Sequence, residues 1–201
     1  MIAQAPIYDA FFWTAERLGM ARRRRRLLAE TSGRVLEIGA GTGLNLDFYP
    51  ESLDRLVLTE PDPAMVSRLT RRAARRPDAE VVEAGAEALP FEDASFDYVV
   101  STMVLCTVPD PAACVAEIER VLRPGGRLLF IEHVRADRRG LARRQDRLDP
   151  LWKKMALGCH CNRPTQALLE DSELTIERLE PAVWYGMPRL IRPLVVGNAT
   201  S

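Results

Sequence analysis

One short segment, V-L-E-I-G-A-G-T-G at residues 35–43, constrains this chain more than any other. An apolar strand runs directly into three glycines at alternate positions, Gly39, Gly41 and Gly43. Glycines in such a turn allow positive φ and let a ligand lie against the main chain. The amide groups that follow the turn can then bind a polar cofactor. A dinucleotide-binding loop would read G-x-G-x-x-G, but its third glycine would fall at Leu44, so this loop is of another nucleotide-type class.

Strand and helix patterns alternate along the rest of the chain. An aspartate followed by proline, at Asp62-Pro63 and Asp110-Pro111, predicts the start of two helices, and the loop glycine Gly43 is expected to begin another. This alternation favours a parallel sheet with helices on both faces. The predicted strands cover residues 34–38, 56–59, 80–83, 96–102 and 127–132, and an edge pair covers 174–179 and 190–196.

The composition is that of one globular domain. The chain has 201 residues, of which 47% are hydrophobic, so it can bury a full core. Lys plus Arg and Asp plus Glu are equal at 28 each, which argues against a dedicated nucleic-acid binder. The only lysines are Lys153 and Lys154, and this arginine bias indicates a GC-rich, bacterial genome. Because no signal peptide and no apolar run of 18 residues is found, we expect a cytoplasmic protein whose four cysteines are free thiols.

Further motifs follow the glycine loop in a fixed order. Glu37 lies two residues before the first glycine, and Glu60 ends the second predicted strand. The other motifs are G-A-E-A-L-P-F at 85–91, D-A-S-F-D at 93–97 and L-R-P-G-G at 122–126. Together they resemble the class I S-adenosylmethionine-dependent methyltransferases over residues 35–130. The resemblance implies an α/β, Rossmann-like fold with a seven-stranded, mostly parallel sheet and an antiparallel edge strand. It also implies S-adenosyl-L-methionine as the cofactor and S-adenosyl-L-homocysteine as the product.

The same resemblance implies a set of cofactor contacts. The carboxylate of Glu60 is expected to accept both ribose hydroxyls, and Met65 either covers an adenine face or fills the core. Gly85 stands where the family usually has aspartate, so main-chain groups of Ala86, or Glu87, are expected to contact adenine. The residues expected to bind the cofactor are Glu37, Gly39, Ala40, Gly41, Thr42, Gly43, Asn45, Glu60, Pro61, Met65, Ala86, Glu87, Thr102 and Met103.

Three segments in the second half narrow the resemblance. They read V-V-S-T-M-V-L-C-T-V at 99–108, F-I-E-H-V at 130–134 and L-D-P-L-W-K-K-M-A-L-G-C-H-C-N-R at 148–163. All three are similar to the methyltransferase-like family that contains the alkyl thiol S-methyltransferases and bacterial relatives. This resemblance implies a small or amphipathic acceptor, most of all a thiol. A looser resemblance to phospholipid N-methyltransferases and quinone C-methyltransferases leaves amine and phenol acceptors as alternatives. An inactive cofactor-binding domain is the alternative from another class, because fold alone does not give function.

His133 is the candidate catalytic residue. It ends the fifth predicted strand, and a histidine with a pKa near neutrality can take a proton from a thiol, amine or phenol. A hydrogen-bonded structural histidine is the alternative. No metal site is expected, because zinc needs three or four ligands and Cys159-His160-Cys161 has no second paired spacing. The other residues expected to face the acceptor are Tyr8, Trp13, Leu105, Cys106, Glu132 and His160.

We expect a single domain over residues 1–201, divided by role. The parts are an N-terminal helical lid at 1–33, a cofactor-binding core at 34–133, a lid or substrate segment at 134–163, and a C-terminal helix with edge strands at 164–201. Five consecutive arginines, Arg22 to Arg26, would wrap around a helix and are expected to be solvated and partly salt-bridged. Contact of this basic helix with a membrane surface is the alternative.

Overall fold

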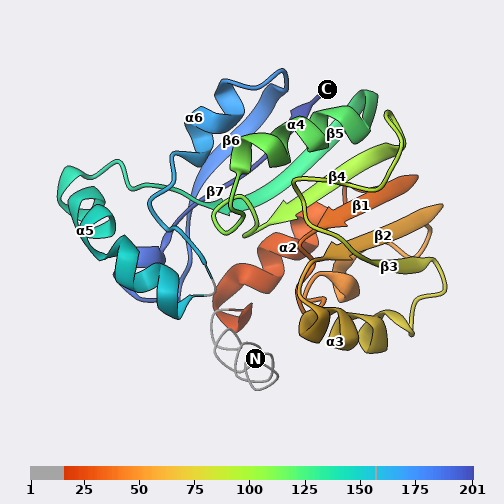
Figure 1. The fold of residues 1–201 in the computed structure, drawn as a ribbon, viewed down its shortest axis with the longest axis horizontal. Coiled ribbons are helices and arrows are strands. Elements are labelled where there is room, and N and C mark those ends of the chain that lie inside the picture. Colours follow the sequence, from red (N-terminus) through yellow and green to blue (C-terminus); the bar gives the residue numbers. More distant parts are fainter. Residues whose placement is uncertain (1–15, 157) are drawn as a thin grey trace.

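The computed structural model describes residues 16–156 and 158–201. All seven of its strands join one sheet, in the order β3-β2-β1-β4-β5-β7-β6. Figure 1 shows this sheet with helices packed around it. The elements are η1 (Glu16–Met20), α2 (Ala21–Leu28), β1 (Arg34–Ile38), η2 (Leu46–Phe48), β2 (Arg55–Glu60), α3 (Pro63–Ala73), β3 (Ala79–Glu83), β4 (Phe96–Thr102), α4 (Pro111–Val121), β5 (Leu122–His133), α5 (Arg139–Met155), α6 (Thr165–Glu170), β6 (Thr175–Val183), η3 (Arg189–Ile191) and β7 (Pro193–Thr200).

The sheet is mostly parallel, as predicted. Strands β1 to β5 pair in parallel, whereas β7 runs antiparallel to both β5 and β6. The predicted edge pair is therefore confirmed, with the reversed strand β7 second from the edge and β6 outside it. Chain order reverses between β1 and β4, and ligands of open α/β sheets bind at the carboxyl ends of the strands beside such a switch point.

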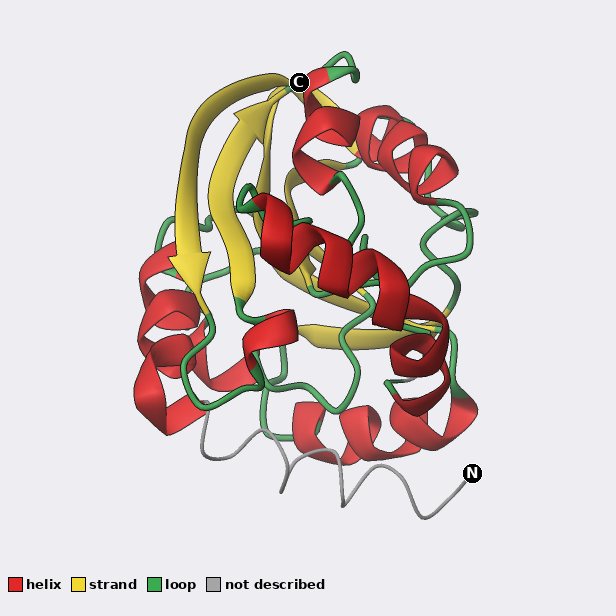
Figure 2. Cartoon of the chain, turned by 90° about the vertical axis from the view of Figure 1, so that its left-hand side faces the viewer, coloured by secondary structure: helices red, strands yellow, loops and turns green. Residues whose placement is uncertain are grey.

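Helices cover both faces of the sheet, and Figure 2 shows helices on both sides of the strands. On one face, Leu27 of α2 and Leu69 of α3 pack against Val35. On the other, Ile118 of α4 and Leu169 of α6 join a core that contains Leu36. Because successive strand residues point to opposite faces, the buried strand β1 needs apolar residues at consecutive positions. In the described part of the chain, no helix combines the length and the apolar character needed to cross a membrane.

The helix expected to begin near Gly43 is absent, which corrects that prediction. The chain makes turns up to residue 45 and then the short 3-10 helix η2. Pro50 ends this short helix, because a residue before proline is disfavoured in helical geometry and Tyr49 accordingly has an extended ψ of 144°.

Strand β5 also begins earlier than predicted. It starts at Leu122, which pairs with Phe96, and the P-G-G segment forms an irregular section where the register with β4 shifts. The last strand, β7, begins three residues and ends four residues later than the predicted range, because η3 occupies the preceding residues.

A substitution at Gly197 should show how tightly the edge strands pack. A Cβ there would collide with the carbonyl oxygen of Arg178, which is a backbone atom. It would also lie 2.7 Å from Cζ of Phe130. Since a backbone atom cannot rotate away, Gly197→Ala is expected to lower the free energy of unfolding by about 2 kcal/mol or more. Urea denaturation measures the change. Gly140→Ala is the matched control, because a Cβ at Gly140 meets no atom within 4 Å. An equally stable Gly197 variant would contradict the prediction.

Candidate active site

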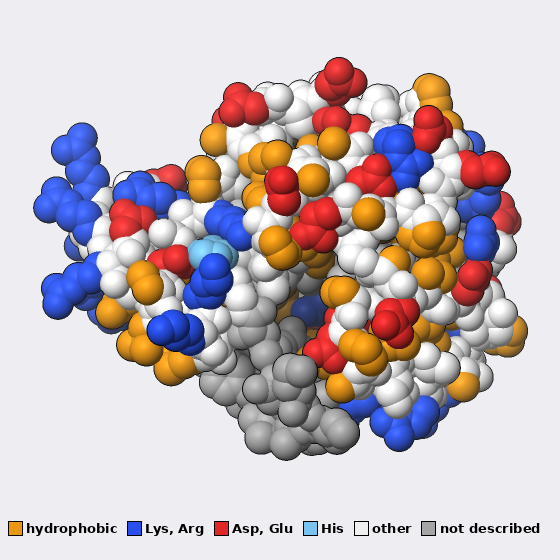
Figure 3. All heavy atoms as spheres, viewed as in Figure 1, with side chains coloured by type: hydrophobic (Ala, Val, Ile, Leu, Met, Phe, Trp, Pro, Cys, Tyr) orange, Lys and Arg blue, Asp and Glu red, His pale blue; other side chains and the backbone are white. Residues whose placement is uncertain are grey.

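All three loop glycines have a positive φ, but the space around their Cβ positions differs. A Cβ at Gly39 would lie 2.8 Å from Cγ2 of Val104, and one at Gly43 would lie 2.7 Å from Cδ1 of Leu46, so crowding adds to the effect of the positive φ at both positions. Gly41 has a φ of +58° and no atom within 4 Å of its Cβ position. The protein therefore leaves space over the main chain at Gly41, as a loop that receives a ligand requires. In Figure 3, the surface is hollowed near the carboxyl ends of the central strands.

Glu60 lies beside this open loop, at the carboxyl end of β2. Its Oε2 accepts a hydrogen bond from the amide of Gly41 at 2.9 Å, and its Oε1 accepts one from the amide of Asp62 at 3.0 Å. The side chain is buried, and burial raises the pKa of this carboxyl above its ordinary value. Two main-chain bonds thus orient a carboxylate next to the open loop, with lone pairs left for hydroxyl donors. These residues fit a cofactor that carries a ribose.

A buried polar network supports the loop from beneath. The side-chain nitrogen Nδ2 of Asn45 donates to Oε1 of Glu37 at 2.9 Å and to Oγ1 of Thr102 at 3.2 Å. The hydroxyl of Tyr49 donates to Oε2 of Glu37 at 2.7 Å. Glu37 and Asn45 were both predicted to contact the cofactor. In the structure, their side-chain hydrogen bonds attach the loop to β1 and β4. Tyr49 was not singled out as a site residue, although it belongs to the Y-P pair that ends this loop.

Arg24 is an exception to the expectation that the arginine run is solvated, whereas its ion pair with Glu16 agrees with the expectation that the run is partly salt-bridged. Its Nη1 donates to Oδ1 of Asn45 at 2.7 Å, and its Nε donates to Oε1 of Glu16 at 3.1 Å. The side chain is buried, whereas Arg22 and Arg26 are not. One arginine of the run thus belongs to the polar network, because α2 packs against the end of the sheet where the glycine loop lies.

Stability should depend on pH through Glu37. Burial raises the pKa of this carboxyl from 4.5 to about 7. Between those values the folded protein keeps a proton that the unfolded chain releases, so stability falls as pH rises through this window. At about 1.4 kcal/mol per pKa unit, the total is about 3 kcal/mol. Glu37→Gln should remove most of this fall between pH 5 and 8, as measured by urea unfolding without cofactor. Identical pH profiles for the two proteins would contradict the assignment.

The remaining predicted cofactor residues lie on the segments that follow β1, β2, β3 and β4. Met65 and Ala86 are buried, and Met103 has a positive φ of 61°, which is unusual for a residue other than glycine. The carboxylate of Glu87 accepts a long bond of 3.5 Å from the amide of Asp110. Contact of these side chains with the cofactor stays a prediction, as it does for Ala40, Thr42 and Pro61.

Glu132 organises the acceptor end of the sheet. Its Oε1 accepts from Oγ of Ser101 at 2.7 Å and from the amide of Val104 at 2.9 Å, and its Oε2 accepts from the amide of Cys106 at 3.4 Å. The residue is fully buried, and burial raises the pKa of its carboxyl. These bonds tie the loop after β4 to β5, so the structure assigns Glu132 a positioning role. Substrate contact by Glu132 stays a prediction.

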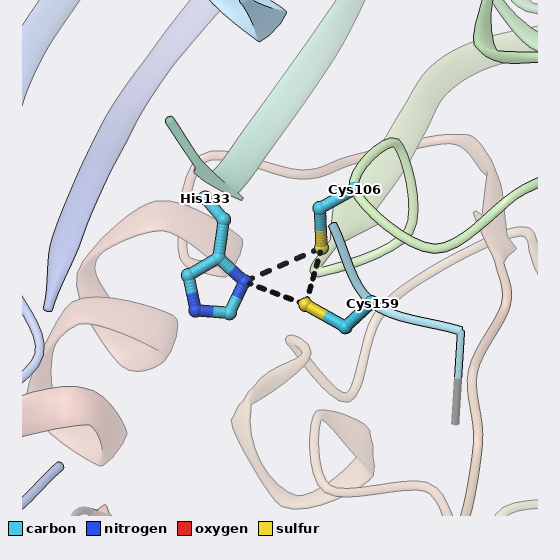
Figure 4. Close-up of side chains that lie close together, drawn as sticks. All are labelled: Cys106, His133 and Cys159. Carbon is cyan, nitrogen blue, oxygen red and sulfur yellow. Dashed lines mark hydrogen bonds between the residues drawn. The ribbon is translucent and has the colours of Figure 1, made fainter. Parts of the chain in front are cut away.

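His133 lies at the centre of a sulfur-rich cluster at this end of the sheet. Its Nδ1 is 3.3 Å from Sγ of Cys106 and 3.5 Å from Sγ of Cys159, and the two sulfurs are 3.7 Å apart (Figure 4). All three side chains are buried. The Nε2 atom of His133 points away from the sulfurs and has no hydrogen-bond partner among the described residues. His133 and Cys106 were predicted at this site from the sequence, whereas Cys159 was not.

The segment after α5 brings Cys159 to this cluster. The amide of His160 donates to the carbonyl of Cys106 at 2.7 Å, and Nη1 of Arg163 donates to the carbonyl of Leu105 at 2.7 Å. His160 itself pairs with Asp149 through Nδ1 at 2.8 Å. Its predicted contact with the substrate, like that of Leu105, stays a prediction. Tyr8 and Trp13 lie outside the described residues.

An open sheet with this strand order, an open glycine loop after β1 and a carboxylate at the end of β2 fit a class I S-adenosylmethionine-dependent methyltransferase. The family described as "Methyltransferase domain" matches residues 36–130. Thiol S-methyltransferase TMT1B of Homo sapiens is 35% identical over 198 residues, which are 90% of this chain and 80% of the human protein. The chain belongs to the methyltransferase family that contains these thiol S-methyltransferases. Its cofactor is S-adenosylmethionine and its product S-adenosylhomocysteine.

Two further comparisons bear on the fold and the acceptor. Phosphatidylethanolamine N-methyltransferase of Cereibacter sphaeroides is 31% identical over 177 residues, which are 84% of this chain and 85% of that protein. Among solved structures, the N-methyltransferase NodS of Bradyrhizobium japonicum, in complex with S-adenosylhomocysteine, has a TM-score of 0.67 at 18% identity. The similarity covers 93% of this chain and 87% of NodS and shows a shared fold.

Proposed function

We propose that this methyltransferase acts on a thiol, producing a methyl thioether. The observation that carries the proposal is the buried imidazole of His133 at the carboxyl end of β5, with Nε2 unpaired among the described residues. The similarity to TMT1B over most of both chains supports the same acceptor class. A thiol has an ordinary pKa of about 8.5, so one weak base is enough to ionise it near neutral pH.

Separate residues are assigned to cofactor binding and to activation of the acceptor thiol. We assign cofactor binding to the open loop at Gly41 and to the Glu60 carboxylate, which aligns the donor. We assign the proton of the His133 imidazole to Nδ1, which lies beside the sulfurs of Cys106 and Cys159. This tautomer leaves a lone pair on Nε2. Nε2 then takes the proton of the acceptor S–H, and the acceptor sulfur forms a bond to the methyl group as the donor's sulfonium–methyl bond breaks. Bound S-adenosylmethionine supplies that methyl group, activated by its positive sulfur.

The segment 134–163 is proposed to cover the acceptor. It includes the exposed helix α5, over which basic side chains gather in Figure 3. The hydrogen bonds from His160 and Arg163 fasten its end to the loop after β4. A covered site excludes water, which would otherwise solvate the thiolate and slow methyl transfer.

A screen of acceptor classes tests the proposal. Alkyl thiols, primary amines and phenols are offered at equal concentration, and S-adenosylhomocysteine release is measured. Alkyl thiols are expected to react fastest. Preference for an amine or a phenol, with thiols inert, would overturn the acceptor assignment, and no turnover with any class would favour an inactive cofactor-binding domain.

One observation favours a second candidate, an amine acceptor on a phospholipid. The phosphatidylethanolamine N-methyltransferase matches nearly as much of the chain as TMT1B does. Helix α5 presents the exposed apolar residues Leu148, Leu151 and Met155 together with Lys153 and Lys154, a composition suited to a lipid surface. Methylation of phosphatidylethanolamine vesicles in the same screen would support this alternative.

A further inference from the structure

We infer that Cys106, His133 and Cys159 form a binding site for one zinc ion or a similar thiophilic divalent ion. The three ligand atoms, two Sγ and Nδ1, all lie within 4.8 Å of one another. This inference goes beyond the proposed methyl transfer, and it departs from the absence of a metal site expected from the cysteine spacing.

The distances match those of a tetrahedral zinc centre. Zinc binds sulfur at about 2.3 Å and histidine nitrogen at about 2.0–2.1 Å. Tetrahedral angles then place two sulfurs about 3.8 Å apart and a sulfur and a nitrogen about 3.5 Å apart. The observed separations are 3.7 Å between the sulfurs of Cys106 and Cys159, and 3.3 and 3.5 Å from those sulfurs to Nδ1 of His133. The observed separations therefore differ from the tetrahedral ones by about 0.2 Å at most.

The site is preformed by contacts that do not involve its ligand atoms. Glu132 receives the amide of Cys106, and the carbonyl of Cys106 receives the amide of His160 next to Cys159. The hydroxyl of Thr165 donates to the carbonyl of His133 at 2.8 Å. Because each ligand residue is anchored at or beside its main chain, the three side chains converge at little cost in entropy.

The chemistry of the ligands selects the kind of ion. Two thiols and an imidazole suit Zn²⁺ and other thiophilic ions, whereas Mg²⁺ and Ca²⁺ prefer oxygen. Three protein ligands leave the fourth position to water or another ligand, as in zinc sites that bind exogenous groups. Both thiols must lose their protons to bind the ion, so ion binding should release protons.

Metal binding would change the chemistry open to His133. An imidazole bound through Nδ1 keeps its proton on Nε2, so the loaded protein cannot use Nε2 as a base. A thiol acceptor would then have to ionise at the fourth position of the ion. The acceptor thiol thus ionises either at Nε2 of His133 or at the bound ion. Comparing the methylation rates of the zinc-loaded and the chelator-treated protein decides between these two routes, and it is separate from the test of whether the ion binds.

Cobalt substitution tests the site without relying on activity. The full chain, reduced and freed of metal, is titrated with Co²⁺ under nitrogen. We expect thiolate-to-cobalt charge-transfer bands and the intense visible bands of tetrahedral cobalt, saturating at one equivalent and lost when Zn²⁺ is added. X-ray absorption of the zinc-loaded wild-type protein is expected to show two sulfur ligands and at least one nitrogen. Absence of the bands, or a zinc shell made of oxygen and nitrogen only, would overturn the inference.

Variants then assign the ligands. Cys106→Ser, Cys159→Ser and His133→Ala are each expected to weaken zinc binding by about 100-fold or more in competition with a chromophoric chelator. Cys114→Ser is the matched control, because Cys114 is a buried thiol on α4 outside the cluster, and it should bind zinc like the wild type. Circular dichroism verifies folding of each variant. Equal affinity in a folded Cys106 or Cys159 variant would overturn the site, and the wild-type spectra remain decisive if a variant does not fold.

Discussion

Replacing His133 by alanine is expected to lower kcat for a thiol acceptor by about 100-fold or more, with little change in affinity for S-adenosylmethionine. General acid–base catalysis by a positioned side chain contributes about 10²- to 10⁴-fold. The imidazole lies at the end of β5, whereas the open glycine loop and Glu60 follow β1 and end β2. A loss confined to kcat would therefore separate acceptor activation from donor binding.

Steady-state kinetics with one alkyl thiol, and calorimetry with S-adenosylmethionine, measure the two quantities. The rate loss should shrink at high pH, because the acceptor thiol then ionises without help. A purely structural role for His133 would give a loss independent of pH. Wild-type kcat at pH 7 in a folded variant would remove His133 from the mechanism and leave the thiol assignment to similarity alone.

Replacing Glu60 by alanine is expected to weaken S-adenosylmethionine binding by about 10- to 100-fold. Hydrogen bonds to a charged group contribute about 1.5–3 kcal/mol, and each 1.4 kcal/mol is tenfold in Kd. The substitution also removes the acceptor for the amides of Gly41 and Asp62, so it loosens the loop that the cofactor meets.

Glu83→Ala is the matched control for this prediction. Glu83 ends β3 in register with Glu60, but its side chain is exposed and it lies one strand farther from the glycine loop. Calorimetry should show wild-type affinity for Glu83→Ala and an intermediate loss for Glu60→Gln, which keeps one oxygen acceptor. Unchanged affinity in a folded Glu60→Ala protein would refute the assignment of the ribose contact.

Local patterns were sufficient for most of the sheet. Strand β4 was predicted at its observed bounds, and the Asp-Pro pairs located the starts of α3 and α4, where both aspartate side chains accept amide hydrogen bonds. These signals are local, because a cap, a proline and a run of apolar residues each act within a few positions. The prediction of a helix after Gly43 was wrong for a longer-range reason. Asn45 and Tyr49 turn inward to Glu37, and Pro50 prevents a helical continuation.

The motif residues also indicated at which end of the sheet the functional site lies. In a parallel sheet the residues that end the strands meet at one edge, so the positions of Glu60, Glu132 and His133 followed from the strand pattern. The roles of their side chains did not. The carboxylate of Glu132 accepts hydrogen bonds from a serine of β4 and from two main-chain amides after β4. Arg24 is buried and donates a hydrogen bond to Asn45, although no other arginine of the run is buried.

The sulfur cluster was decided by tertiary structure alone. Cys106 and Cys159 are 53 residues apart, and their spacing resembles no paired metal motif. They meet because β4 and β5 are neighbours in the sheet and because the segment after α5 folds back onto the loop after β4 through the amide of His160 and the guanidinium of Arg163. Sequence spacing reports only ligands carried by one local element, whereas a site assembled from three separate segments exists only once long-range hydrogen bonds and sheet pairing bring them together.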